Sequence, residues 1–202
     1  LSLPEVKALA EHKRIKKDLT KAERAVANYL TCLRYIQKHK GLKRLDDERI
    51  LQLHHIIGEG AVENGPIGRY RSIQNYIVAA AGSIVYRPPP PEKVLELMKQ
   101  LLAWVNKKSK NQLPVISSGI IHYECVAIHP FVDGNGRVAR ALGTWELLRR
   151  NFDTNHIFAI DDIIYEHKQS YYAALRSVQN NRGVLTHWLE FYLEIVAESL
   201  ER

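Results

Sequence analysis

Cysteine is scarce in this sequence. The 202 residues include only Cys32 and Cys125, which lie far apart in the chain. Two distant cysteines exclude the disulfide framework that stabilises small secreted domains, and they favour a reducing, cytoplasmic location. Each lies in an apolar pattern with helical spacing, so we interpret both as small core residues rather than catalytic thiols.

Long apolar runs are also missing. No segment approaches the ~20 apolar residues that a membrane-spanning helix needs, so we expect no membrane partner. The first residues, Leu1–Glu5, lack the basic-then-apolar layout of a secretory signal. The chain does not start with methionine, which leaves open that it is a piece of a longer protein.

Acidic residues are outnumbered by basic ones, which gives a formal net charge of +7 and a pI of about 9.4. Such a balance can indicate a nucleic-acid partner. The basic residues are dispersed, however, and their densest groups, Lys13–Lys17 and Lys107–Lys110, are typical of solvated helix ends or loops. We therefore expect no nucleic-acid partner, and a basic interaction module is kept as the non-enzymatic alternative.

Strand signals are few, whereas apolar residues at helical spacing dominate the chain. The best strand pattern is Gly68–Ala79, and Ser83–Tyr86 could return against it as a short hairpin. We predict an all-α fold with one small β-hairpin, formed by residues 1–202 as a single domain. Helices are predicted over Ala22–Gln37, Asp46–Ile56, Glu92–Val105, Val115–Ile128, Arg137–Arg150, Tyr165–Gln179 and Thr186–Leu200.

One string of residues indicates phosphate chemistry. Gly134 and Gly136 flank Asn135 and leave backbone amides accessible, just before a strongly periodic helix. A helix N-terminus with exposed N–H groups binds anions. Arg137 can form a fork on phosphate oxygens, and Arg140 lies one helical turn further on the same face.

Two residues beside this string complete a reactive set. Asp133 supplies a hard oxygen ligand suited to Mg²⁺. His129, at the end of the preceding helix, has an ordinary pKa near neutrality and can accept a proton from an attacking hydroxyl. Phe131 is expected to point into the core and hold the loop. Taken together, these residues predict phosphoryl or nucleotidyl transfer.

The string resembles the motif of the Fic family, His-x-Phe-x-Asp/Glu-Gly-Asn-Gly-Arg-x-x-Arg, and matches every defined position from His129 to Arg140. The resemblance extends over about residues 20–195. It includes Pro66–Arg71, which is similar to the start of the family's flap hairpin, and the proline-rich stretch Tyr86–Pro90. It implies the Fic fold, a helical bundle around the motif-bearing helices with a β-hairpin flap.

The resemblance also implies an activity, the transfer of AMP from ATP to a Ser, Thr or Tyr hydroxyl of a target protein. His129 would be the general base, Arg137 would stabilise developing charge, and Asp133 would hold Mg²⁺. The resemblance places nucleotide contacts on Gly134, Asn135, Gly136, Arg137, Arg140, Tyr172 and Gln179. It places target contacts on the flap residues Ser72, Ile73, Gln74, Asn75, Tyr76, Ile77 and Val78. For Tyr172, packing in the core is an equal interpretation, and for Gln179 a side chain that faces solvent is an equal interpretation.

Several alternatives stay open. A Doc-like kinase would transfer the γ-phosphate, but that branch resembles the motif with Lys in place of Gly136. The motif alone does not exclude other donors, such as UTP or a CDP-linked choline. A metal hydrolase built on His54-His55 and His122-Tyr123-Glu124 has no zinc spacing, and each histidine is expected to be exposed or hydrogen-bonded locally.

The family's inhibitory helix, Ser/Thr-x-x-x-Glu-Gly/Asn, has no convincing match. Only Thr186 has a glutamate four residues on, and Phe191 follows that glutamate. The element is therefore absent from this chain, lies upstream of Leu1, or comes from a partner. If it lies upstream, a dual enzyme that adds and removes AMP is a further alternative. The resemblance also raises a homodimer as a possibility.

Overall fold

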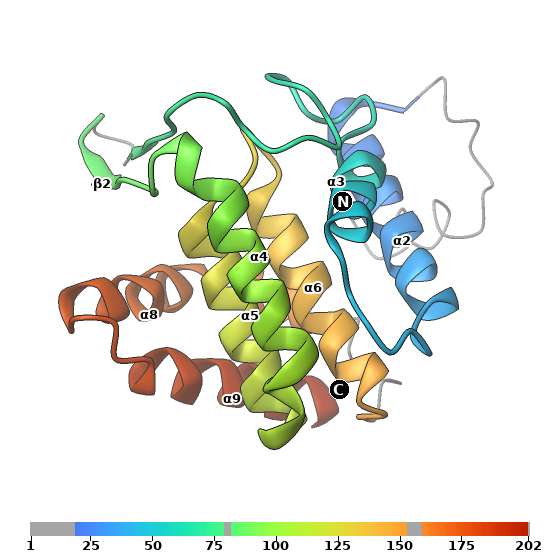
Figure 1. The fold of residues 1–202 in the computed structure, drawn as a ribbon, viewed down its shortest axis with the longest axis vertical. Coiled ribbons are helices and arrows are strands. Elements are labelled where there is room, and N and C mark those ends of the chain that lie inside the picture. Colours follow the sequence, from blue (N-terminus) through green and yellow to red (C-terminus); the bar gives the residue numbers. More distant parts are fainter. Residues whose placement is uncertain (1–18, 79–81, 153–158, 202) are drawn as a thin grey trace.

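The computed structural model describes residues 19–78, 82–152 and 159–201. Those residues form helices and one two-stranded antiparallel sheet, as Figure 1 shows. The elements are α2 (Lys21–Lys38), α3 (Asp47–Gly58), β1 (Ile77–Val78), β2 (Ile84–Tyr86), α4 (Pro91–Lys107), the 3-10 turn η2 (Ser109–Asn111), α5 (Pro114–Ile128), α6 (Asn135–Arg149), α7 (Ala159–Glu166), α8 (Lys168–Asn180) and α9 (Thr186–Glu201).

The helices begin where their sequences supply capping groups. Thr20 and Glu23 form a reciprocal capping box at the start of α2. The Asp46 side chain accepts the Arg49 main-chain N–H at the start of α3. Helices α4 and α5 both begin with proline, which has no N–H to leave unsatisfied in a first turn.

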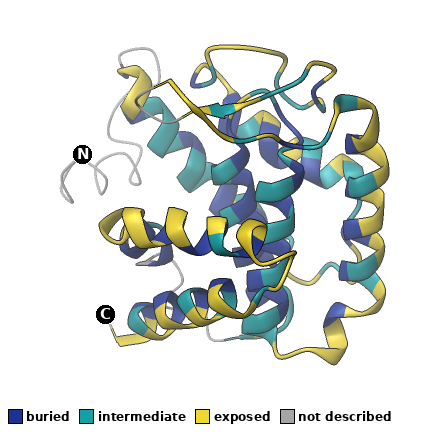
Figure 2. Cartoon of the chain, turned by 90° about the vertical axis from the view of Figure 1, so that its left-hand side faces the viewer, coloured by how far each residue is buried: buried dark blue, intermediate teal, exposed yellow. Residues whose placement is uncertain are grey.

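Helices α5 and α6 form the centre of the domain. Helices α2 and α3 lie on one side of the pair, and α8 and α9 lie on the other (Figure 1). Buried residues occur on all faces of α6, and Figure 2 shows the exposed residues on the outer surfaces of the surrounding helices. Because both central helices are held from all sides, the loop that joins them starts and ends on rigid elements.

The core consists of two apolar clusters. One lies among α2, α3, α4, α5 and α6 and contains both cysteines, which are buried free thiols as predicted. The other lies among α6, α7, α8 and α9, packs against α5, and includes Trp188 and Tyr192. Among the described residues, no helix is both long and apolar enough to cross a membrane.

The predicted strand over residues 68–79 is mostly wrong. Only Ile77–Val78 forms strand, opposite Tyr86 and Ile84, and Ala79 lies outside the described residues. The preceding segment is held by bonds to other loops instead, since the Arg71 main-chain N–H donates to the Pro130 carbonyl. The helix predicted over residues 165–179 begins at Lys168, and α7 precedes it as a separate helix.

Candidate functional site

His129 ends α5 in the left-handed conformation, with φ 52° and ψ 58°. Its Nδ1 lies 3.2 Å from the Val126 carbonyl oxygen. Because a carbonyl can only accept, Nδ1 carries the proton of the neutral ring. The neutral imidazole therefore keeps its lone pair on Nε2, the nitrogen that a general base would use.

The surroundings of His129 favour the neutral ring. Burial lowers the pKa of His129, and the positive charge of Arg71 lowers it further. The Val126 carbonyl and the Asp133 carboxylate act in the opposite direction without cancelling that effect. His129 is thus ready to accept a proton at neutral pH.

The loop that follows, residues 129–134, is fixed by Asn135 and Phe131. The Asn135 side chain accepts the Phe131 main-chain N–H and donates to its carbonyl, both at 2.8 Å. Phe131 is fully buried, as predicted, and its ring stacks on His54 at a centroid distance of 3.8 Å. The Asn135 side chain therefore holds the loop, while the main chain of Asn135 forms the start of α6.

His54 is a site residue that sequence reasoning missed. The prediction that it is exposed or bonded only locally is wrong, because it is buried and its Nδ1 accepts the Gly68 N–H at 2.9 Å. Its Nε2–H then donates to the Asp133 carbonyl at 3.0 Å. Burial lowers the pKa of His54 and so keeps the ring neutral, while the two hydrogen bonds select this tautomer. Its place in the buried stripe of Ile50, Leu53 and Ile57 was the available signal.

A cationic cavity of about 280 Å³ opens at the start of α6. Gly134 precedes the helix with φ 83°, a conformation that favours glycine, and presents the first-turn amides to the cavity. The half-exposed Asp133 carboxylate lies 3.9 Å from an Arg137 Nη atom. The lining residues are His129, Val132, Asp133, Gly134, Asn135, Gly136, Arg137 and Arg140.

Arg137, which lines this cavity, has one donor that is unsatisfied in the described part of the chain. Its Nη1 is buried and has no hydrogen-bond partner among the residues that the structure describes. Burial lowers the pKa of Arg137, although the guanidinium remains charged at any physiological pH. A buried, charged N–H without an acceptor is costly. The positive charge of Arg137 beside the cavity also favours an anion there.

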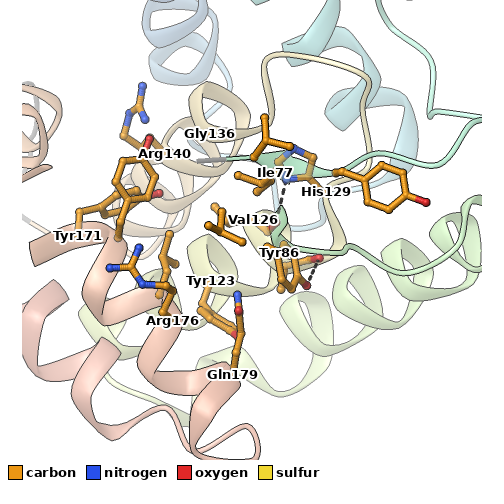
Figure 3. A pocket seen from close by; sticks show the side chains of 16 residues that line it. Ile77, Tyr86, Tyr123, Val126, His129, Gly136, Arg140, Tyr171, Arg176 and Gln179 are labelled. Atoms are coloured by element: carbon orange, nitrogen blue, oxygen red, sulfur yellow. Dashed lines mark hydrogen bonds between the residues drawn. The ribbon is translucent and has the colours of Figure 1, made fainter. Parts of the chain in front are cut away.

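An apolar cavity of about 400 Å³, whose lining residues are drawn in Figure 3, shares part of its wall with the cationic one. Tyr172 and Gln179 of α8, on which the resemblance places base contacts, both line it. Tyr172 is partly exposed rather than a core residue. Arg176, on the same helix, also lines the cavity and was not predicted. The remaining walls come from Tyr76, Ile77, Val78, Val85, Tyr86, Tyr123, Val126, Ala127, Tyr171 and Leu175.

Three residues belong to both cavities: His129, Gly136 and Arg140. A ligand that fills both would therefore pass directly beside the His129 ring. One half of such a ligand would contact apolar and aromatic side chains, and the other half would contact arginines and helix amides. This combination matches a nucleoside joined to a chain of phosphates.

The flap, residues 72–78, lies beside these cavities. Ile73, Tyr76 and Val78 are exposed, with 57%, 47% and 58% of their surface accessible. The Gln74 and Asn75 side chains point inward instead: Gln74 donates to the Pro88 carbonyl, and Asn75 donates to the Phe131 carbonyl at 2.8 Å. In the described part of the chain, β1 pairs with a strand on one edge only.

Arg71 connects the flap to the loop that carries His129. Its buried guanidinium donates to the carbonyls of His129 at 2.7 Å, Ile73 at 2.9 Å and Pro89 at 2.5 Å. Its own main-chain N–H donates to the Pro130 carbonyl. One side chain thus joins the start of the flap, the proline-rich stretch and the end of α5.

The sequence resembles named enzymes. Protein adenylyltransferase fic-1 of Caenorhabditis elegans is 30% identical over 179 residues, which cover 88% of this chain and 32% of that protein. Protein adenylyltransferase Fic of Nematostella vectensis is 32% identical over 168 residues, covering 83% of this chain and 34% of that protein. The chain therefore spans about a third of the length of these relatives.

Solved structures have the same fold. A Fic family protein from Desulfovibrio desulfuricans superposes with a TM-score of 0.78 at 27% identity, covering 100% of this chain and 58% of the other. A Fic domain protein from Bacteroides thetaiotaomicron superposes with a TM-score of 0.80 at 22% identity, covering 100% of this chain and 78% of the other. The sequence model of the Fic/DOC family matches residues 44–147, which include the whole motif, all of α5 and most of α6. This chain belongs to the Fic/DOC family.

Proposed function

We propose that this protein is a protein adenylyltransferase, which transfers AMP from ATP to a hydroxyl group of a target protein. One observation carries the proposal: His129, with its lone pair on Nε2, lies on the wall that the apolar and cationic cavities share. The relatives that carry the name adenylyltransferase support the same reaction.

The two cavities suggest how ATP would lie. The adenine would bind in the apolar cavity beside Tyr172 and Gln179, since an aromatic ring and an amide can stack on and hydrogen-bond to a purine. The triphosphate would extend into the cationic cavity. There it would meet the first-turn amides of α6, Arg137 and Arg140. The α-phosphate, which is nearest the nucleoside, would lie near the shared wall.

The reaction then follows from the position of His129. The target hydroxyl oxygen attacks the α-phosphorus, while its proton moves to Nε2 of His129. The bond from the α-phosphorus to the bridging oxygen of the β-phosphate breaks, and pyrophosphate leaves with its electron pair. Arg137 and the helix amides stabilise the negative charge that develops on the phosphate oxygens.

Asp133 is the residue that would hold Mg²⁺. Its half-exposed carboxylate faces the cationic cavity. The described residues include no group of three or more His, Cys, Asp or Glu side chains that could hold a metal by themselves. One carboxylate together with substrate phosphates is a common environment for Mg²⁺, so the site fits this ion. Bound there, Mg²⁺ would neutralise phosphate charge.

The acceptor segment would bind to the flap. Its exposed residues and the open edge of β1 support recognition of an extended target segment by main-chain pairing.

The two buried free thiols support the predicted cytoplasmic location. A homodimer stays a prediction, as does the assignment of residues 1–202 to a single domain.

A pair of labelling reactions tests the activity. With ATP labelled on the α-phosphate, label should appear in protein, and with ATP labelled on the γ-phosphate it should not. The reverse pattern would identify a kinase and overturn the proposal. Because the target is unknown, the purified protein and a cell extract serve together as acceptor sources.

Substitution of His129 tests the mechanism. His129→Ala should abolish transfer, a loss of at least about a hundredfold, while ATP binding measured by calorimetry largely survives. His129→Asn is the matched variant, because asparagine tolerates the left-handed conformation of residue 129 better than alanine does. Transfer by either variant at the parent rate would show that His129 is not the base.

A further inference from the structure

Arg140 has a partner that the sequence did not indicate. Its Nε donates to Oδ1 of Asp161. Asp161 belongs to α7 and lies outside the motif. Both side chains are largely shielded, with 23% and 22% of their surface exposed. The Arg140 guanidinium also lies over the Tyr29 ring of α2, 5.9 Å from its centroid. Arg140, which lies on α6, is therefore held by contacts with α2 and α7.

The contact uses one edge of the guanidinium and leaves another edge available. Arginine has five N–H donors, and Asp161 engages the one on Nε. A Cβ atom placed on Gly136 would lie 3.5 Å from Arg140 Nη1, so that nitrogen lies beside the bare backbone of the first turn of α6. Arg140 also lines both cavities. The ion pair thus orients Nη1 towards the site.

Asp161 is itself firmly placed. Its neighbours on α7, Ile160, Ile163 and Ile164, are buried in the apolar cluster that α7 shares with α8 and α9. A carboxylate on a helix anchored in this way does not follow the guanidinium, so the guanidinium must adapt to the carboxylate. Holding arginine in one rotamer before a ligand arrives removes an entropic cost of binding.

We propose that Asp161 is a positioning residue, which holds Arg140 in the orientation that receives the terminal phosphate of the nucleotide. This inference rests on the proposed function, since it takes the phosphate chain to lie in the cationic cavity. It makes α7 part of the nucleotide site, although α7 lies outside the motif. The distinguishing property is selectivity: Asp161 should matter for a triphosphate and much less for a diphosphate.

Calorimetry with a non-hydrolysable ATP analogue and with ADP, both with Mg²⁺, tests this selectivity. The parent should bind the triphosphate more tightly, and Arg140→Ala should lose that preference. Asp161→Ala should reduce triphosphate affinity by about tenfold and leave ADP affinity nearly unchanged. Asp161→Asn should lie between, because its amide oxygen can still accept from Nε.

Asp162→Asn is the matched control, because it alters the neighbouring acid on the same helix, where the side chain is exposed. It should behave as the parent. Thermal unfolding confirms that each variant is folded. If Asp161→Ala does not fold, Asp161→Asn is used in its place for the comparison of affinities.

Two results would overturn the inference. If the Asp161 variants bind the triphosphate more tightly, the carboxylate competes with phosphate rather than positioning the arginine. If their ratio of triphosphate to diphosphate affinity equals that of the parent, while Arg140→Ala loses its preference, Asp161 has no role in this contact. If the parent itself binds neither nucleotide, the proposed function fails first, which is a distinguishable outcome.

Discussion

At the scale of single residues, the proposed chemistry depends on one nitrogen atom, Nε2 of His129. Its availability is a consequence of the Val126 carbonyl, which fixes the proton on Nδ1. No sequence pattern specifies that bond. It arises because α5 ends at a left-handed residue, which turns the ring back over the last turn of its own helix.

The pKa of His129 gives a pH prediction. Burial and Arg71 lower it below the ordinary value of about 6.5, so the neutral, active ring persists to lower pH than for an exposed histidine. The acidic limb of kcat/KM should therefore fall below pH ~6.5, with activity lost as pH decreases through it. Initial rates of AMP transfer between pH 4.5 and 8 measure this limb. A limb at or above pH 7 would contradict the assignment.

At the scale of secondary-structure elements, Arg71 connects the flap to the loop that carries His129 through several hydrogen bonds. Arg71→Lys should lower the transfer rate at least about tenfold, because an ammonium group cannot reproduce the guanidinium fork on several carbonyls. It should also destabilise the fold by ~2 kcal/mol, a fall in melting temperature of roughly 4–8 °C for a chain of this size.

Arg69→Lys is the control for that change, since Arg69 is exposed and only two residues away. It should leave both rate and melting temperature as in the parent. If Arg71→Lys were equally silent, the connection between flap and loop would have no functional weight.

The helices could be predicted from the sequence, but the flap could not. Apolar spacing and caps such as Thr20 and Asp46 are local signals, and they placed most helix ends within a few residues. The residues before β1 show the alternation of a strand, yet their hydrogen bonds go to Pro88, Phe131 and Pro130. Those partners are distant in sequence, so no local pattern reveals them.

The same distinction applies to the site. The motif from His129 to Arg140 was visible because its chemistry is contiguous in the chain. His54 and Asp161 were not, because each acts on the motif from a separate helix. A buried histidine inside an apolar helical stripe is the kind of signal that could have pointed to His54.

At the scale of the whole molecule, buried histidines connect stability to pH. His122 is fully buried among Tyr171, Trp188 and Tyr192, and burial lowers its pKa to about 3. Its Nε2 lies 3.0 Å from the Tyr171 hydroxyl. Below pH ~6.5 the unfolded chain binds a proton here that the folded protein does not. This residue should therefore lower the free energy of unfolding by about 1.4 kcal/mol for each unit by which the pH decreases below that value.

His122→Gln should remove that slope, because its amide does not titrate and can still bond to the Tyr171 hydroxyl. Urea unfolding of parent and variant between pH 7 and 5 measures the difference in slope. The comparison cancels the contributions of other groups, including Glu124, whose pKa is raised by burial. Equal slopes would show that His122 is protonated in the folded protein.

The wall that the two cavities share has a consequence for how a donor is read. In the proposed binding mode, a nucleoside in the apolar cavity would set the position of the phosphate chain, and the first phosphorus would lie beside His129. The position of His129 relative to the nucleoside would then determine which phosphorus is attacked. A donor inserted in the opposite direction would place its last phosphorus there instead, so the orientation of the bound nucleotide decides which group is transferred.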